Sequence, residues 1–215
     1  MIEIPVLDTD GKKIGGEQLD PELLGGRVRH DLLKQAVVAH RANRRQGTVQ
    51  TKSRAHVHGS SRKLYKQKGT GRARAGNLRT PVRVGGGHAF HKINRDFDQK
   101  MNRKMRRLAR NSAILAKALA GQMLIVDGLK FETPSTKKMA KAMKAVDAGH
   151  GALFTYIAMD ANLVKSSRNI PTLTIKSIFD VNAYDVLKGR RLMLTPDAFQ
   201  ALVNDPVTLG RGVEA

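Results

Sequence analysis

The alternation of strand and helix that decides the fold is clearest in residues 153–175, which read LFTYIAMDANLVKSSRNIPTLTI. The apolar run at residues 153–158 is typical of a buried strand. Asp160 then precedes a short helical segment that ends near Arg168, and a second apolar run follows at residues 173–175. A strand, a helix and a strand in this order predict two parallel strands of one sheet.

The same alternation extends in both directions along the chain. Apolar runs at residues 124–126 and 192–194 are further candidate strands, and residues 2–6 add another. Helix starts follow at Thr133-Pro134 and Thr195-Pro196. Together these elements predict an α/β fold of the Rossmann-like, three-layer kind, with an open, mostly parallel sheet flanked by helices.

Two longer helices are predicted, one before and one after a basic insert. Asp31 is a candidate N-cap of the first helix, and Asp98 is a candidate N-cap of the second, which Gly121 can end. The buried face of the second helix is predicted at Met101, Met105, Leu108, Ser112, Leu115 and Leu119. Its opposite face is basic and carries Lys100, Arg103, Lys104, Arg106, Arg107 and Arg110.

The positive charge is confined to one part of the chain. The 215 residues contain 39 Lys and Arg against 18 Asp and Glu, a formal net charge of +21. Residues 32–110 hold 22 of these cations and only two acids, a net charge of +20, and no acid occurs in residues 32–95. The rest of the chain has a net charge of +1, from 17 basic and 16 acidic residues. A confined excess of this size predicts one segment that binds a polyanion.

Residues 46–95, called here the basic insert, are predicted to form a long extended loop. They contain eight Gly, four His, few large apolar residues and no sustained helical periodicity. Ordinary loops end at roughly 12–15 residues, so an insert of this length is a functional extension. We expect residues 1–45 and 96–215 to form one discontinuous globular α/β domain, and the insert to take its order from a partner.

Composition excludes several classes of protein. The chain has no Cys, which excludes a disulfide framework, a thiolate metal site and a Cys nucleophile. Its longest strongly apolar run, residues 152–159, is too short to span a bilayer, and the N-terminus lacks the features of a targeting peptide. The sequence therefore predicts a cytoplasmic protein without a membrane partner.

Motifs for nucleotide binding and catalysis are missing from the sequence. There is no G-x-x-x-x-G-K-[ST] segment and no G-x-G-x-x-G after a strand. His56 and His58 could share a metal ion, but no nearby acid completes such a site, so no metal or other cofactor is expected. Five acids are expected near strand ends: Asp8, Asp10, Asp127, Asp160 and Asp180. Asp is common at such positions because it caps helices and stabilises turns, so no catalytic role is needed to explain them. We therefore expect that the protein is not an enzyme.

The strongest functional signal lies in residues 62–81, which read RKLYKQKGTGRARAGNLRTP, and in the three glycines at residues 85–87. Arg and Lys supply phosphate contacts, and Tyr65 is a candidate platform for base stacking. Glycine allows the backbone to approach phosphate closely. An irregular basic segment suits folded RNA better than a duplex groove. Duplex DNA, an anionic membrane surface and a solvated basic tail remain alternatives.

Several of these motifs together resemble the bacterial family of ribosomal large-subunit protein four. They occur in the family's order and spacing at residues 45–48 (RQGT), 51–54 (TKSR), 67–74 (QKGTGRAR), Pro81 and 85–87 (GGG), followed by the helix start at residues 100–107. The chain departs from the family at four positions. Leu64 replaces a usual Pro, Asn77 replaces a common Ser, and His88 replaces an apolar residue. Arg83 replaces an aromatic residue, and its guanidinium can also stack.

The resemblance implies a structural constituent of the large ribosomal subunit that binds large-subunit rRNA early in assembly. It implies that the extended loop lines a constriction of the polypeptide exit tunnel, close to where macrolide antibiotics sit. The implied partners are large-subunit rRNA, neighbouring large-subunit ribosomal proteins and the nascent peptide, with the protein a monomer within the cytoplasmic ribosome. By motif, the loop tip consists of Lys66, Gln67, Lys68, Gly69, Thr70, Gly71 and Arg72.

The RNA-contacting residues are predicted from charge, motif and helix face. They are Arg44, Arg45, Lys52, Arg54, Arg62, Lys63, Tyr65, Lys66, Lys68, Arg72, Arg74, Arg79, Arg83, Lys100, Arg103, Lys104 and Arg107. The alternative function is an α/β nucleic-acid-processing enzyme that uses the insert as a substrate clamp. That reading requires carboxylates far apart in sequence to converge in the fold. A histone-like DNA compactor is a third possibility.

Overall fold

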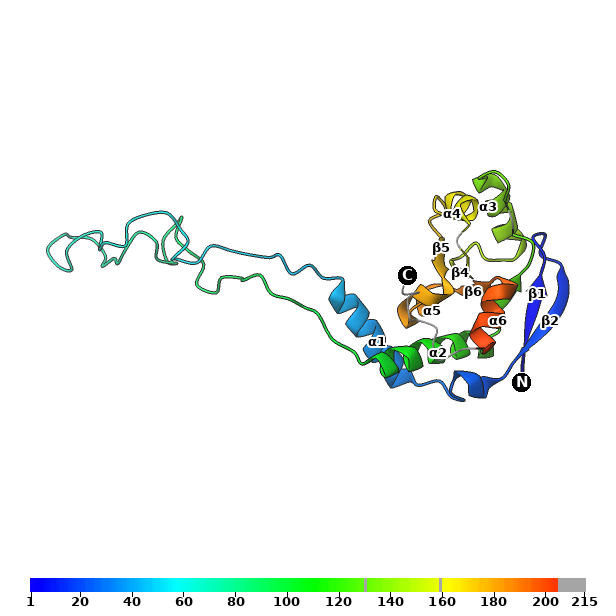
Figure 1. Cartoon of the computed structure of the whole chain (residues 1–215). Helices are drawn as coiled ribbons and strands as arrows, with labels where there is room; N and C mark the ends of the chain where they lie inside the picture. The colour runs from blue at the N-terminus through cyan, green and yellow to red at the C-terminus, as the bar shows by residue number, and fades with distance from the viewer. Residues whose placement is uncertain (130, 159, 205–215) are drawn as a thin grey trace. The chain divides into compact units, whose positions relative to one another are not determined.

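A six-stranded sheet forms the centre of the computed structural model, which describes residues 1–129, 131–158 and 160–204 (Figure 1). The strands are β1 (Ile2–Leu7), β2 (Lys13–Leu19), β3 (Met123–Val126), β4 (Ala152–Tyr156), β5 (Leu173–Ser177) and β6 (Arg191–Leu194). They lie in the order β2-β1-β3-β6-β4-β5. Every neighbouring pair is parallel except β1 and β2, which are antiparallel. The predicted open, mostly parallel sheet is confirmed.

Both faces of the sheet are buried, because successive strand side chains enter two different cores. Met123 and Ile125 of β3 lie in the first core, whereas Leu124 and Val126 lie in the second. The first core also contains residues of α1 (His30–Asn43), α2 (Arg103–Leu119), α5 (Ala183–Lys188) and α6 (Pro196–Asn204). The second contains residues of α3 (Thr136–Ala145) and α4 (Ala161–Ser167). Helices therefore cover both faces, and the predicted three-layer arrangement is confirmed.

The starts of the helices follow the predicted caps only in part. Asp160 caps α4, since its Oδ1 accepts a hydrogen bond from the N–H of Asn162 at 2.9 Å. Asp31 is not an N-cap, because α1 already begins at His30. Asp98 is not an N-cap either: α2 is preceded by Asn102, and Asp98 instead donates its N–H to Asp96 Oδ1 at 3.0 Å.

One strand and one α-helix were not predicted, and one position of α2 was wrongly placed on its buried face. β2 contains Gly15 and Gly16 and forms an exposed edge, so it lacks the apolar alternation of a half-buried strand. α5 has only six residues, too few for an apolar period to show. Leu119 is 61% exposed because α2 ends there, whereas the periodicity placed it on the buried face.

Internal contacts divide the chain into two units. The first contains the sheet and consists of Met1–Arg41 and Lys100–Ala215, and the second is Ala42–Gln99. Residues 44–102 contain no helix or strand, and Gly87 is the only buried residue among them. The predicted division into a globular domain of residues 1–45 and 96–215 and an extended loop of residues 46–95 stays a prediction. Among the described residues, no helix combines the length and the apolar character needed to cross a membrane.

Candidate nucleic-acid interface

The two arms of the basic insert run side by side, joined by a few backbone hydrogen bonds (Figure 1). The bonds are Arg95 N to Gly47 O (3.3 Å), Thr51 N to Lys92 O (3.0 Å), His88 N to Lys52 O (2.9 Å) and Leu64 N to Gly76 O (3.0 Å). They are too widely spaced to form a strand ladder, so turns and isolated bonds rather than a packed core give the insert its shape.

An aromatic ring between two cations marks the base of the arms. The guanidinium of Arg45 lies 3.7 Å from the centroid of the Phe97 ring, and that of Arg95 lies 4.4 Å from it. The base is also closed by Gln99, whose N–H donates to Asn43 Oδ1 at 2.7 Å. Stacking uses the plane of a guanidinium and leaves its N–H edge able to donate to phosphate. The predicted RNA contact of Arg45 is therefore compatible with its place on Phe97.

The glycines at residues 85–87 serve close approach within the chain itself. A Cβ on Gly87 would lie 2.2 Å from the backbone nitrogen of Arg54, and one on Gly86 would lie 1.9 Å from the carbonyl oxygen of Thr80. Gly87 N also donates to Arg79 O at 3.0 Å. In the structure Gly87 lets its arm approach the backbone of the other arm closely, and Gly86 lets the chain fold back on Thr80 of its own arm. The predicted approach of these glycines to phosphate stays a prediction.

The tip of the insert is closed by side chains from its two flanks. The hydroxyl of Tyr65 donates to the carbonyl oxygen of Ala73, and Lys63 Nζ donates to Gln67 Oε1 at 2.8 Å and to Ala75 O at 3.1 Å. Between them, Gly69 and Gly71 turn the chain with φ of +84° and +66°, values that favour glycine. Residues 66–74 are all exposed. Tyr65 thus holds the tip together, a role its sequence position did not predict.

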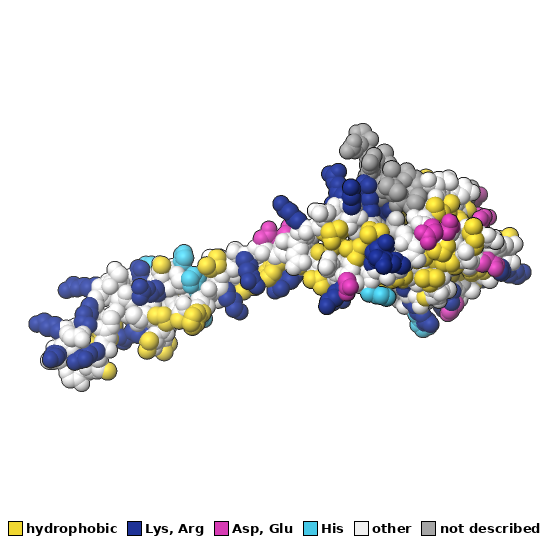
Figure 2. Space-filling model, turned by 90° about the horizontal axis from the view of Figure 1, so that it is seen from below, with side chains coloured by type: hydrophobic (Ala, Val, Ile, Leu, Met, Phe, Trp, Pro, Cys, Tyr) yellow, Lys and Arg dark blue, Asp and Glu magenta, His cyan; other side chains and the backbone are white. Residues whose placement is uncertain are grey.

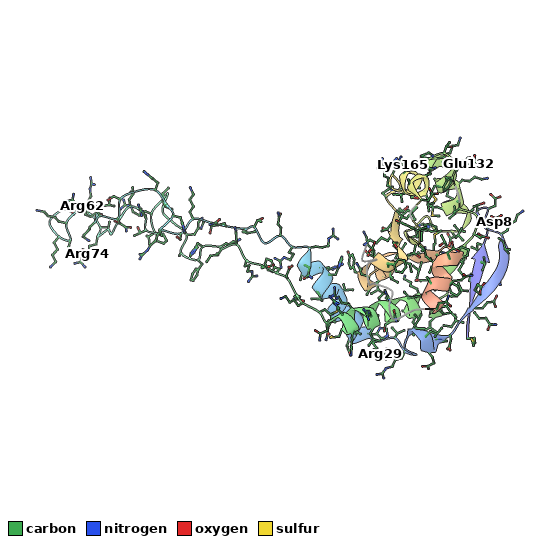
Figure 3. All side chains as sticks on the ribbon, viewed as in Figure 1. Asp8, Arg29, Arg62, Arg74, Glu132 and Lys165 are labelled. Atoms are coloured by element: carbon green, nitrogen blue, oxygen red, sulfur yellow. The ribbon has the colours of Figure 1, made fainter. Side chains whose placement is uncertain are left out.

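The predicted RNA-contacting cations are mostly exposed and form none of the ion pairs found among the described residues. All of them are exposed except Arg79 and Arg107, which are half-buried, as is Tyr65. Figure 2 shows Lys and Arg side chains along the insert, and Figure 3 places Arg62 and Arg74 at the same end of it. The ion pairs found among the described residues join Lys13 to Glu3, Lys141 to Asp10, Lys176 to Asp185 and Arg191 to Asp147. None of these pairs involves the insert.

The first turns of α2 form a second basic surface. Arg103, Lys104 and Arg106 are exposed there, and no acid occurs in the first turn. Arg110 does not belong to this surface, contrary to prediction, because it is only 4% exposed. Its Nη2 donates to Asn111 Oδ1 at 3.0 Å. The reason is that α2 is buried on all sides from residue 109 to residue 115, where the sheet, α5 and the helical turn at Pro21–Leu24 surround it.

One cation of α2 has a structural role in the core. Lys117 is 9% exposed, and its Nζ donates to Gln122 Oε1 at 2.8 Å and to Arg190 O at 3.1 Å. Burial lowers the pKa of the Lys117 ammonium, because a low-dielectric environment disfavours its charged form. Lys117 therefore ties α2 to the segment that precedes β6 and is not available to a partner.

The acids considered for catalysis each have a local structural partner or an isolated position. Asp8 Oδ1 accepts from Thr9 N at 2.6 Å, and Asp127 Oδ1 accepts from Gly128 N at 2.7 Å. Asp10 pairs with Lys141, Asp160 caps α4, and Asp180 is exposed. Across residues 1–129, 131–158 and 160–204, no group of three or more His, Asp or Glu could hold a metal ion. The described residues therefore offer no metal-binding carboxylate cluster of the kind that the enzyme alternative would use.

These features define a class of protein. Several acids of the α/β body lie in caps, turns or ion pairs, and the long basic segment contains no acid. This arrangement is typical of structural proteins that bind a polyanion through an extended segment. Comparison with known families narrows the class: the profile of the ribosomal protein L4/L1 family matches residues 17–205. The chain belongs to this family and is a structural protein rather than an enzyme. The predicted family resemblance is confirmed.

Relatives from several organisms cover most of the chain. A large ribosomal subunit protein uL4 from Desulforudis audaxviator is 39% identical over 193 residues, which are 90% of this chain and 93% of the relative. The uL4 protein of Dehalococcoides mccartyi is 40% identical over 197 residues, with 92% and 94% of the two chains covered. That of Pelotomaculum thermopropionicum is 40% identical over 198 residues, with 92% and 96% covered.

Proposed function

We propose that this protein is a structural constituent of the large ribosomal subunit in the cytoplasmic ribosome, where it binds large-subunit rRNA. The single observation that carries the proposal is the basic insert: 50 residues, most of them exposed, that contain 12 Lys and Arg and no acid. Family membership supplies the setting in which such a segment finds RNA. The protein has no catalytic role in this assembly.

Two surfaces, the first turns of α2 and the basic insert, bind the rRNA in this proposal. The body docks through the basic first turns of α2, where Arg103, Lys104 and Arg107 contact phosphate. The insert penetrates the RNA and joins segments that are distant in its secondary structure. Cations along both arms contact phosphate, and the narrow, irregular backbone fits between helices of a folded RNA.

The tip of the insert, residues 66–72, lies at a constriction of the polypeptide exit tunnel in this proposal. The family resemblance of residues 67–74 supports this placement, and the closed, wholly exposed tip is consistent with it. Its partners there are the nascent peptide and neighbouring large-subunit proteins. The protein enters as a monomer early in assembly, since an insert enclosed by RNA must be in place before the RNA closes around it.

Electrostatic binding of this kind has a measurable salt dependence. For about 10 simultaneous phosphate contacts, the logarithm of the association constant falls with the logarithm of salt concentration at a slope near −7, at about −0.7 per contact. Filter binding of the protein to a large-subunit rRNA transcript across a salt series measures this slope. A slope close to zero with tight binding would contradict a mechanism based on phosphate contacts.

Sedimentation tests the assignment in cells. A tagged chain is expressed, the lysate is sedimented at low magnesium to separate the subunits, and the gradient is probed for the tag. The tag is expected in the large-subunit peak and in its assembly precursors. Its absence from that peak, with the tagged protein present at the top of the gradient, would falsify the proposed function.

A further inference from the structure

One aromatic side chain of the basic insert is left uncovered. Phe90 is 98% exposed, whereas every one of the other eight Phe and Tyr residues is at least partly covered. The two other aromatics in Ala42–Gln99 have roles within the chain. The hydroxyl of Tyr65 donates to Ala73 O, and Arg45 and Arg95 lie against the ring of Phe97.

The backbone presents Phe90 on a bulge that is fixed at both ends. Thr51 is bonded to Lys92, through Thr51 N to Lys92 O at 3.0 Å and Lys92 N to Thr51 Oγ1 at 2.7 Å. The next residue of the same arm, Lys52, accepts the N–H of His88 at 2.9 Å. Two consecutive residues of one arm therefore face residues 88 and 92 of the other, and residues 89–91 are forced outward with Phe90 at their centre.

Anchoring of this kind reduces the entropy cost of binding through Phe90. A ring held on a fixed bulge loses less backbone freedom when it meets a partner than a ring on a free loop. Gly87, just before the bulge, adds to the anchoring because it packs against the backbone of Arg54. A Phe left in water loses the favourable free energy of burying its ring, so an anchored and uncovered ring indicates a partner.

The surroundings of Phe90 specify the chemistry of that partner. His88, His91, Lys92 and Lys52 are exposed on the residues that frame the bulge, and residues 32–95 contain no acid. A flat apolar ring among cations complements a nucleobase, which has a π face and is attached to a phosphate. An apolar pocket on a protein would complement the ring but not the cations around it.

We propose that Phe90 stacks on an unpaired nucleobase of the large-subunit rRNA. This inference rests on the proposed function, since it names one base-contacting site within the RNA interface. It moves the stacking role from Tyr65, the platform expected from sequence, to Phe90. The signal that could have indicated Phe90 is a lone aromatic residue flanked by His88, His91 and Lys92.

The chain contains no Trp, which gives the inference a direct spectroscopic test. The Phe90→Trp variant of the full chain carries a single Trp at the bulge. The matched control is Val84→Trp, at a position in the same insert that is also fully exposed. Both are titrated with protein-free large-subunit rRNA. Stacking is expected to quench the indole fluorescence of Phe90→Trp and to shield it from iodide, whereas the indole of Val84→Trp stays accessible.

Affinity provides the second readout. Losing one stacked base costs about 1–3 kcal/mol, so Phe90→Ala is expected to weaken rRNA binding about 5- to 150-fold. Phe90→Tyr is expected to keep the affinity, and Phe90→Leu, which is apolar without a π face, is expected to lose it. Val84→Ala is expected to bind as the parent does.

The outcomes separate this inference from the function on which it rests. Tight, salt-dependent rRNA binding in which the indole of Phe90→Trp is unquenched, or quenched no more than that of Val84→Trp, would overturn the stacking site and leave the proposed function standing. Equal binding by Phe90→Leu and the parent would also overturn it, in favour of a nonspecific apolar contact. Failure of the parent chain itself to bind rRNA would refute the proposed function.

Discussion

At the scale of single residues, Gly87 is a position where the structure leaves no room for a side chain. A Cβ there would lie 2.2 Å from the nitrogen of Arg54, a backbone atom that cannot move aside alone. We expect Gly87→Ala to separate the two arms around residues 79–87. It is also expected to weaken rRNA binding by about tenfold or more, because the free-energy cost of ordering the insert is then part of the binding step. Filter binding measures the affinity, and hydrogen exchange of the insert measures the separation.

The control for this prediction is Gly76→Ala. Its added Cβ would meet only the Thr80 methyl group at 3.6 Å, an ordinary contact, and Gly76 does not have a positive φ. The thermal midpoint of the body is expected to stay the same in both variants. Equal rRNA affinity for Gly87→Ala and Gly76→Ala would show that the close approach of the two arms at Gly87 does not matter for binding.

Lys68 tests the placement of the tip. It is exposed between Tyr65 and the turn at Gly69. Reversing its charge in Lys68→Glu is expected to leave the body folded and to change macrolide sensitivity, because the tip lies beside the drug site in the proposed placement. Minimum inhibitory concentrations in a strain that depends on the variant measure this, with the exposed body residue Lys12→Glu as control. Unchanged sensitivity with normal assembly would count against Lys68 at the tip.

The residue scale also shows where sequence patterns are insufficient. Most of the predicted cations are exposed because they lie in a segment that has too few apolar residues to form a core. Arg110 was misplaced because helical periodicity identifies a face but not how far along the helix that face stays uncovered. The roles of Tyr65 and Phe90 depend on which residues of the two arms lie opposite each other, and no local pattern encodes that pairing.

At the scale of elements, the first turn of α2 carries cations that the dipole of the same helix destabilises. Arg103 and Lys104 lie in the first turn, where the helix dipole is positive and no acid offsets it. We expect the double variant Arg103→Gln, Lys104→Gln to stabilise the free body slightly, by about 0.3–1 kcal/mol per removed charge at low salt. The same change is expected to reduce the magnitude of the salt slope of rRNA binding by about 0.7 for each phosphate that is no longer neutralised.

Lys188→Gln is the matched control, because Lys188 lies in the last turn of α5, where a cation is favourable. Its removal is expected to lower the thermal midpoint slightly and to leave the salt slope unchanged. Thermal unfolding and a salt series of binding measurements test both variants. If the α2 variant and the parent have the same salt slope, α2 does not contact the phosphates of the rRNA.

Elements were predictable from sequence where burial is complete on both faces. β3 and β6 are short, but their continuous apolar runs identify them, as expected for parallel strands covered by helices. β2 was not predicted, because an edge strand with two glycines and exposed polar residues has the composition of a loop. Asp98 is not a cap because the non-helical backbone after the insert continues to Asn102, and the helix begins at Arg103.

At the scale of the whole molecule, the body and the insert are expected to be energetically separate. Arg95 N donates to Gly47 O at 3.3 Å, so a short glycine linker can replace residues 48–94 without stretching the chain. The shortened protein is expected to unfold cooperatively at nearly the same temperature as the parent, because both cores lie outside the insert. Its affinity for rRNA is expected to fall by at least about 100-fold, because the deleted cations no longer neutralise phosphates. Calorimetry and filter binding measure the two effects, and an unfolded body would contradict the proposed domain division.

The central claim, that the insert is the main RNA-binding part of the molecule, is tested most directly by a crosslinking map. Assembled large subunits that contain the protein are irradiated, digested and analysed by mass spectrometry for residues joined to rRNA. The account predicts crosslinks along residues 44–107, densest at residues 62–83 and including Phe90, with few in the strands. A map with most crosslinks on α3 and α4 and none in residues 46–95 would contradict it.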